Sequence, residues 1–274
     1  MSWNSAESPE NVARTPGAWL RAVRRGVPLA FVVFGCLAVL MLVRLIERPL
    51  FGMQRPLTPF ITQFVCRTAF AILGMGFRVE GQPMAEKGAA VANHSTWLDI
   101  FALNAPQRVY FVSKAEVAGW PGIGWLARAT GTLFIERKRS QAVEHGQMFK
   151  KRLLAGHHLM FFPEGTSTDG RRVLPFKPTL FAPFLDDALR DALHIQPISL
   201  VYEAPEDRSD RFYGWWGDMD FGSGLLNVLM VRDPGSVTVV FHAPLKVSDF
   251  ADRKALAKAL EDVVRTRVPQ PRDA

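Results

Sequence analysis

Several features that would narrow the function at once are missing from this 274-residue sequence. It has only two cysteines, Cys36 and Cys66, which lie in apolar segments without ligand-like spacing, so we expect neither a disulfide scaffold nor a cysteine zinc site. The Gly-x-Ser-x-Gly turn of serine hydrolases and the His-Glu-x-x-His helix of zinc proteases are also absent. The adjacent His157 and His158 point in different directions and make a poor metal pair, so we expect no metal.

The chain also lacks any recognisable nucleic-acid-binding motif, although it is basic, with a formal net charge of +7. Hydrophobic residues make up 48% of the sequence, and the mean hydropathy of +0.05 is high for a purely soluble enzyme. An anionic membrane surface therefore fits the charge better than nucleic acid does.

The N-terminal region has the composition of a membrane anchor. Residues 1–13 are polar, and we expect them to be disordered. Arginines then precede an apolar run over 27–43, which is about 25 Å as a helix and short of the roughly 30 Å of a bilayer core. A second apolar stretch covers 60–77. We expect residues 14–77 to form membrane-anchoring helices, either a spanning helix with an interfacial one or a hairpin in one leaflet. Two buried core helices are the alternative.

Residues 78–274 have the pattern of one α/β domain. Short apolar runs alternate with helical stretches at 140–155 and 250–268, and 203–220 reads as a long loop. This alternation predicts a mixed, largely parallel sheet covered by helices. The expected strands are 77–80, 88–92, 109–113, 132–135, 158–162, 195–202 and 237–242.

His94 and Asp99 have the composition of a base and its orienting carboxylate. Histidine accepts a proton near neutral pH, and a carboxylate can fix its tautomer. Five residues of regular helix turn through about 500°, which would leave the two side chains about 140° apart. We therefore expect His94 at the end of a strand over 89–92 and Asp99 on a helix capped by Ser95 or Thr96.

A second polar segment, Phe-Pro-Glu-Gly-Thr, follows an apolar run and ends at Thr166. Pro163 fixes the chain direction, and Gly165 permits a sharp turn with exposed N–H groups. A histidine–carboxylate dyad beside such a turn suits acyl transfer to a hydroxyl, because backbone N–H groups can hold an oxyanion.

These motifs resemble those of the lysophosphatidate acyltransferase (PlsC-like) family of glycerolipid acyltransferases. The resemblance covers roughly residues 80–205, and its motifs keep the family's order and spacing. The matching positions are Asn93, His94 and Asp99 (Asn-His-x4-Asp), Gly131, Phe134, Ile135 and Arg137 (Gly-x-x-Phe-Ile-x-Arg), Phe162 to Thr166, and Pro197 before an apolar strand.

The resemblance implies a membrane-bound O-acyltransferase with His94 as general base and Asp99 as its partner. The donor is an acyl thioester of acyl carrier protein or coenzyme A, and no cofactor is required. Because such thioesters are made in the cytosol, we expect an inner-membrane enzyme whose active site faces the cytoplasm. The implied substrate-binding residues are Asn93, Gly131, Phe134, Arg137, Glu164, Gly165 and Thr166.

One departure from the family pattern concerns the acceptor lipid. Lysophosphatidate-using relatives typically carry arginine where this chain has Ser167, and serine cannot replace a bidentate cation on phosphate. The pattern here resembles the branch that acylates lyso-ornithine lipid and related lyso-aminolipids. We expect that acceptor, with lysophosphatidate as the alternative. Asp169, Asp218 or Asp220 could face the ammonium group of an aminolipid.

Other classes of function predict different behaviour. A non-catalytic lipid-binding protein has no need for the intact set of His94, Asp99, Arg137 and Glu164. A basic nucleic-acid module would bind DNA in a salt-sensitive way without residues 14–77. A thioester hydrolase, the nearest enzymatic rival, would release free fatty acid at full rate without an acceptor.

Overall fold

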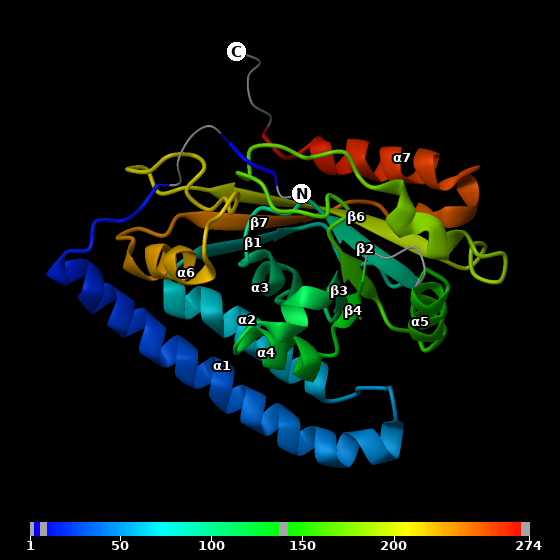
Figure 1. Ribbon diagram of the computed structural model, residues 1–274, viewed down its shortest axis with the longest axis horizontal. Coiled ribbons are helices and arrows are strands. Elements are labelled where there is room, and N and C mark those ends of the chain that lie inside the picture. Colours follow the sequence, from blue (N-terminus) through cyan, green and yellow to red (C-terminus); the bar gives the residue numbers. More distant parts are fainter. Residues whose placement is uncertain (1–2, 6–9, 137–141, 270–274) are drawn as a thin grey trace.

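A single eight-stranded sheet forms the centre of the computed structural model, which describes residues 3–5, 10–136 and 142–269 (Figure 1). The strand order is β1-β7-β6-β2-β5-β3-β4, with β8 beside β6. The strands are β1 (Gly76–Glu80), β2 (Gly88–Ala92), β3 (Tyr110–Lys114), β4 (Leu133–Ile135), β5 (Leu159–Phe161), β6 (His194–Glu203), β7 (Ser236–Phe241) and β8 (Leu245–Lys246).

Helices cover both faces of this sheet (Figure 1). On one face lie α1, α2, α3 and α6, with α4 beside them; α7 and the 3₁₀ segment Pro178–Leu185 lie on the other, and α5 packs near one end. The helices are α1 (Pro16–Phe51), α2 (Thr58–Leu73), α3 (Asp99–Asn104), α4 (Ile123–Thr130), α5 (Ala142–Leu154), α6 (Phe221–Met230) and α7 (Arg253–Arg265).

The expected mixed, largely parallel sheet is confirmed. Every predicted strand is present within one residue at each end. Among the strand pairs of the described residues, β6–β7 and β6–β8 are antiparallel and the others are parallel. The two-residue strand β8 was not predicted, because two residues carry no periodic signal. Apart from Glu203, which ends β6, the segment 203–220 contains neither helix nor strand, as expected.

The sequence of β2 explains its central position. Ala90 and Ala92 pack into the core on the α2 and α3 side, whereas Ala89 and Val91 pack on the α7 side. A parallel strand that is buried on both faces reads as an unbroken apolar run, which is what this segment shows. Its small side chains let the helices approach the sheet just before the first motif.

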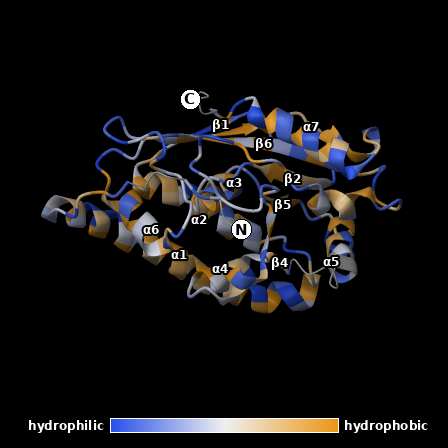
Figure 2. Cartoon of the chain, turned by 45° about the horizontal axis from the view of Figure 1, so that its top comes forward, coloured by the Kyte–Doolittle hydropathy of each residue, from blue (hydrophilic) through white to orange (hydrophobic). Residues whose placement is uncertain are grey.

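The long helix α1 keeps most of its apolar side chains outside the core. Its 36 residues extend about 54 Å, and hydrophobic colours dominate its middle in Figure 2. Within the described ranges, it is the one helix long and apolar enough to cross a membrane, judged by length and composition. Only 17% of its most apolar 18-residue window is buried, so α1 is not an ordinary core helix.

The first turns of α1 are fixed to the domain through the C-terminal end of α6. The guanidinium of Arg25 donates to the carbonyls of Leu229 and Val231 at 3.2 and 2.6 Å, and Arg21 Nε donates to Met230 at 2.7 Å. The last carbonyls of a helix lack partners within the helix, so these arginines satisfy groups that would otherwise be unpaired. Arg25 is 5% exposed.

The N-terminal segment that precedes α1 is held against the domain wherever the structure describes it. Glu10 pairs with Arg208 at 2.9 Å, and the Val12 N–H donates to Asn227 Oδ1 at 3.1 Å. Val12 is 6% exposed. Disorder of residues 1–13 stays a prediction, although Glu10 and Val12 make these contacts with residues distant in sequence.

Replacing Arg25 with methionine should destabilise the fold. The change leaves buried carbonyls of α6 without donors, which should lower the free energy of unfolding by about 2 kcal/mol. Thermal unfolding in detergent measures this, with Arg24→Met as the matched control because Arg24 is exposed. Equal losses in both variants would contradict the role given to Arg25.

Candidate active site

Asn93 joins the end of β2 to the neighbouring strand β6. Its side-chain Oδ1 accepts the Leu200 N–H at 2.8 Å, and its Nδ2 donates to the Leu200 carbonyl at 2.9 Å. The amide thus continues the sheet ladder past the last residue of β2. Asn93 is 1% exposed, which fixes the point from which the loop carrying His94 departs.

His94 and Asp99 form a hydrogen-bonded dyad, as their spacing suggested. The His94 Nδ1 lies 2.7 Å from Asp99 Oδ2, and the imidazole stacks on Phe162 with ring centroids 4.0 Å apart. Asp99 is fully buried, whereas the His94 side chain is 21% exposed. A carboxylate on Nδ1 requires the proton there, which leaves Nε2 as the acceptor.

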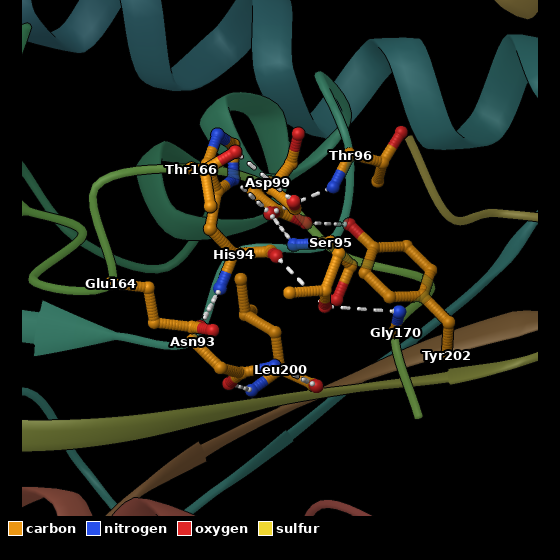
Figure 3. Close-up of polar contacts among 12 residues, drawn as sticks. Asn93, His94, Ser95, Thr96, Asp99, Glu164, Thr166, Gly170, Leu200 and Tyr202 are labelled. Carbon is orange, nitrogen blue, oxygen red and sulfur yellow. Dashed lines mark hydrogen bonds and ion pairs between the residues drawn. The ribbon is translucent and has the colours of Figure 1, made fainter. Parts of the chain in front are cut away.

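Asp99 accepts three further hydrogen bonds (Figure 3). The backbone N–H groups of Ser95 and Thr96 donate to Oδ2 at 2.7 and 3.1 Å, and the Tyr202 hydroxyl donates to Oδ1 at 2.7 Å. The expectation that Ser95 or Thr96 caps α3 is wrong, because the helix begins at Asp99 and its N-cap Leu98 makes no side-chain bond. The Asp99 carboxylate instead fixes the conformation of the loop before α3 by accepting its backbone N–H groups.

Glu164 fixes the backbone of His94 from the second motif. Its two carboxyl oxygens accept the N–H groups of His94 and Leu174, both at 2.8 Å. Glu164 is 1% exposed, and this burial raises its pKa to about 8, although the two backbone donors oppose the shift. The first and second motifs are also joined where the Thr168 N–H donates to the His94 carbonyl at 3.0 Å.

A cavity of about 430 Å³ opens beside the exposed side of His94. Gly165 and Thr166 of the second motif line it, and so do aromatic side chains that include Trp120, Trp215 and Trp216. Gly165 has a φ of +73°, a conformation that favours glycine at this turn. The cavity can therefore hold an apolar chain next to an imidazole whose Nε2 is an acceptor, which is the arrangement needed to deprotonate a hydroxyl.

The comparisons with known proteins agree with this geometry. An acyltransferase family model matches residues 76–201. The chain is 53% identical to the lyso-ornithine lipid O-acyltransferase of Rhodobacter capsulatus, over 98% of this chain and 97% of that protein. The chain belongs to the PlsC-like acyltransferase family.

More distant relatives are named for a different acceptor, 1-acyl-sn-glycerol-3-phosphate. This acyltransferase is 29% identical to the 1-acyl-sn-glycerol-3-phosphate acyltransferase of Neisseria gonorrhoeae, over 75% of this chain and 79% of that protein. The crystal structure of the 1-acyl-sn-glycerophosphate acyltransferase PlsC from Thermotoga maritima shares the fold. It matches with a TM-score of 0.62 and 21% identity, over 93% of this chain and 97% of that one.

The predicted substrate-binding residues of the acyltransferase fall into two groups. Gly165 and Thr166 line the cavity, whereas Asn93 and Glu164 lie behind it and bind backbone groups. Substrate contact by these four residues stays a prediction.

The residues predicted from the Gly-x-x-Phe-Ile-x-Arg motif are distributed differently. Gly131 ends α4 with a φ of +86°, and Phe134 lies in β4 beside Ile135, which does line the cavity. Neither Gly131 nor Phe134 is a lining residue. Arg137 lies outside the described residues. Substrate contact by this motif stays a prediction.

Asp169 does not fit the suggested role of binding an ammonium group. It is 1% exposed, and Arg172 binds both of its oxygens, at 3.1 and 3.0 Å. Arg211 lies 3.4 Å from Asp169 Oδ2. With two guanidinium partners already in place, Asp169 is a structural anchor for the loop after the second motif. Asp220 caps α6 by accepting the Ser223 N–H at 2.9 Å.

Two residues near the site, Tyr202 and Trp3, lie outside the sequence motifs that predicted it. Tyr202 reaches Asp99 across 103 residues of sequence, and only the alternation of β6 could have suggested that it points inward. Trp3 packs edge-on against Trp216, with ring centroids 6.1 Å apart. The backbone N–H of Trp3 donates to Thr166 Oγ1, with 3.4 Å between nitrogen and oxygen. The N-terminal segment thus contacts two of the residues that line the cavity.

Replacing Tyr202 with phenylalanine should slow acyl transfer with little change in KM. Loss of one hydrogen bond to the buried carboxylate loosens the dyad, and a cost of about 1.4 kcal/mol corresponds to a tenfold lower kcat. Steady-state kinetics measures this. Tyr213→Phe is the matched control, because the buried Tyr213 hydroxyl donates to the Pro234 carbonyl and not to Asp99. Equal losses in the two variants would contradict a role through Asp99.

The buried Glu164 should make stability depend on pH. Its native pKa of about 8 exceeds the ordinary value of 4.5, so folding takes up a proton between these values. The stability of the wild type should therefore fall as the pH rises from about 5 to about 8. Thermal unfolding in detergent, compared with Glu164→Gln at each pH, measures this. If the unfolding midpoint of the wild type rose relative to that of Glu164→Gln as the pH increased, the prediction would be contradicted.

Proposed function

We propose that this acyltransferase moves a fatty acyl group from an acyl thioester to the free hydroxyl of lyso-ornithine lipid or a related lyso-aminolipid. The observation that carries the proposal is the His94 imidazole, held by Asp99 at 2.7 Å and open to a largely apolar cavity. The 53% identical relative from Rhodobacter capsulatus bears the name of this activity.

The chemistry follows from the dyad. His94 Nε2 takes the proton of the acceptor hydroxyl as its oxygen attacks the thioester carbonyl, and Asp99 stabilises the resulting imidazolium. The thiolate of acyl carrier protein or coenzyme A leaves and the ester forms. Because the thioester is already activated, no covalent enzyme intermediate and no cofactor is required.

The charges that line the cavity favour a zwitterionic acceptor. Among the described lining residues, Lys114 and Glu116 carry the formal charges. Lys114 Nζ lies 3.5 Å from Glu116 Oε1. Ornithine bound through its α-amide keeps one carboxylate and one ammonium group, which Lys114 and Glu116 complement. Ser167 also lines the cavity, where lysophosphatidate-using relatives typically have the arginine that suits a phosphate monoester.

The helices at 14–77 support attachment to one leaflet of the inner membrane, with 78–274 as the acyltransferase domain. The segment before α1 contacts the domain through Glu10 and Val12. Beyond its other end, Gln54 donates to the Ala155 carbonyl at 2.7 Å. Both ends of α1 thus meet the same domain, which favours a hairpin in one leaflet over a span. Since thioester donors are cytosolic, the active site faces the cytoplasm.

Purified full-length enzyme should use lyso-ornithine lipid at least ten times more efficiently than lysophosphatidate, measured as kcat/KM with one thioester donor. Glu116→Gln should lower this value for lyso-ornithine lipid about tenfold by removing the partner of the ammonium group. Glu206→Gln is the matched control, because Glu206 is exposed and does not line the cavity.

The same assay with His94→Ala tests the catalytic assignment. Loss of the proton acceptor should reduce acyl transfer by about 100- to 10,000-fold. Efficient use of lysophosphatidate with lyso-ornithine lipid ignored would refute the acceptor while leaving the family intact. Turnover by His94→Ala at the wild-type rate would refute the mechanism. Undiminished release of free fatty acid without acceptor would indicate a hydrolase.

A further inference from the structure

A second and larger cavity, of about 860 Å³, lies near the amino ends of the parallel strands, whereas His94 lies at their carboxyl ends. Its walls include 82–84, 106–108 and 156–158, which immediately precede or approach the amino ends of β2, β3 and β5. His94 instead follows the carboxyl end of β2. The two cavities share no lining residue, so this one is separate from the site of acyl transfer.

Two arginines supply the formal charge of the second cavity. Arg55 and Arg108 line it, and none of its lining residues within the described part of the chain is aspartate or glutamate. Two guanidinium groups without an acidic neighbour in the lining favour an anion over a cation.

One buried N–H donor at this cavity, on the side chain of Gln107, has no hydrogen-bond partner. Gln107 is 8% exposed and its Nε2 is unpaired. His157 is 4% exposed, and Arg152 Nη1 lies 3.0 Å from its Nδ1. Because a guanidinium can only donate, Nδ1 must accept and the ring proton must sit on Nε2. That N–H has the Met53 carbonyl as its neighbour.

The protonation state of His157 agrees with this assignment. Burial, reinforced by the neighbouring Arg152 and Arg55, lowers its pKa to about 4. The ring is therefore neutral at pH 7 with a single proton. A buried donor without an acceptor costs about 1–3 kcal/mol, a cost that a bound oxyanion would relieve.

Apolar side chains at the rim indicate what kind of anion fits. Phe51 at the end of α1 and Phe60 in α2 line the same cavity and are 49% and 52% exposed. The Arg108 guanidinium lies over the Phe60 ring, 4.5 Å from its centroid. We propose that this cavity binds the head group of an anionic lipid, with the oxyanion on Arg55, Arg108 and Gln107 Nε2 and the acyl chains along Phe51 and Phe60.

The proposal is tested with the full chain in neutral detergent, by thermal unfolding with dihexanoyl phosphatidylglycerol or dihexanoyl phosphatidylcholine. The anionic lipid should raise the unfolding midpoint by several degrees and the zwitterionic one should not. Arg108→Gln should lose at least half of this shift. Arg253→Gln, which removes an equal charge from α7 on the other face of the sheet, should keep all of it.

Gln107→Leu gives an independent readout, because it removes an unpaired buried donor. This variant should be more stable than the wild type without lipid and should gain less from phosphatidylglycerol. Equal shifts with the two lipids, or a full shift in Arg108→Gln, would overturn the proposal. Inorganic phosphate at the same concentration producing the whole shift would also overturn it, since a free anion would then suffice.

Discussion

The active site depends on one buried carboxylate. Asp99 accepts from the His94 imidazole, the Tyr202 hydroxyl and the backbone N–H groups of Ser95 and Thr96. All four partners are donors, which is the pattern that an acceptor-only carboxylate requires. The same group therefore sets the loop conformation, selects the imidazole tautomer and ties both to β6. Since two of its four bonds come from the backbone, its position is determined by the fold before any substrate arrives.

The second acidic residue of the site shows how the same chemical group serves a different purpose. Glu164 holds the backbone N–H of His94, so the histidine is fixed at its main chain by one motif and at its ring by another residue of its own motif. Phe162 adds a third constraint by stacking on the imidazole. This explains in physical terms why the two motifs are required together: neither alone would fix both the position and the orientation of the ring.

What could be predicted from the sequence was the information that is local. The strands follow from short apolar runs, and the His94–Asp99 contact follows from a spacing that only a strand-to-helix turn allows. Tyr202 and Trp3 could not be found in this way, because each reaches the site from a segment far away in the chain. The pairing of Asp169 with Arg211 was hidden for the same reason. Composition could not reveal the contact of Glu10 with Arg208 either, because the two residues are far apart in the sequence.

The helix α1 runs from α6 to the basic cavity. Its first turns are fixed to α6 by Arg21 and Arg25, and its last residue, Phe51, lines the basic cavity. Between these points many of its apolar side chains are exposed, among them Phe31, Leu42 and Leu45, and Figure 2 shows the hydrophobic colouring of this part of the helix. The proposed attachment to one leaflet would leave the contacts of buried Arg25 with α6 in place. It would also bring the rim of the basic cavity to the level of the lipid head groups, because Phe51 at the end of α1 lines that cavity.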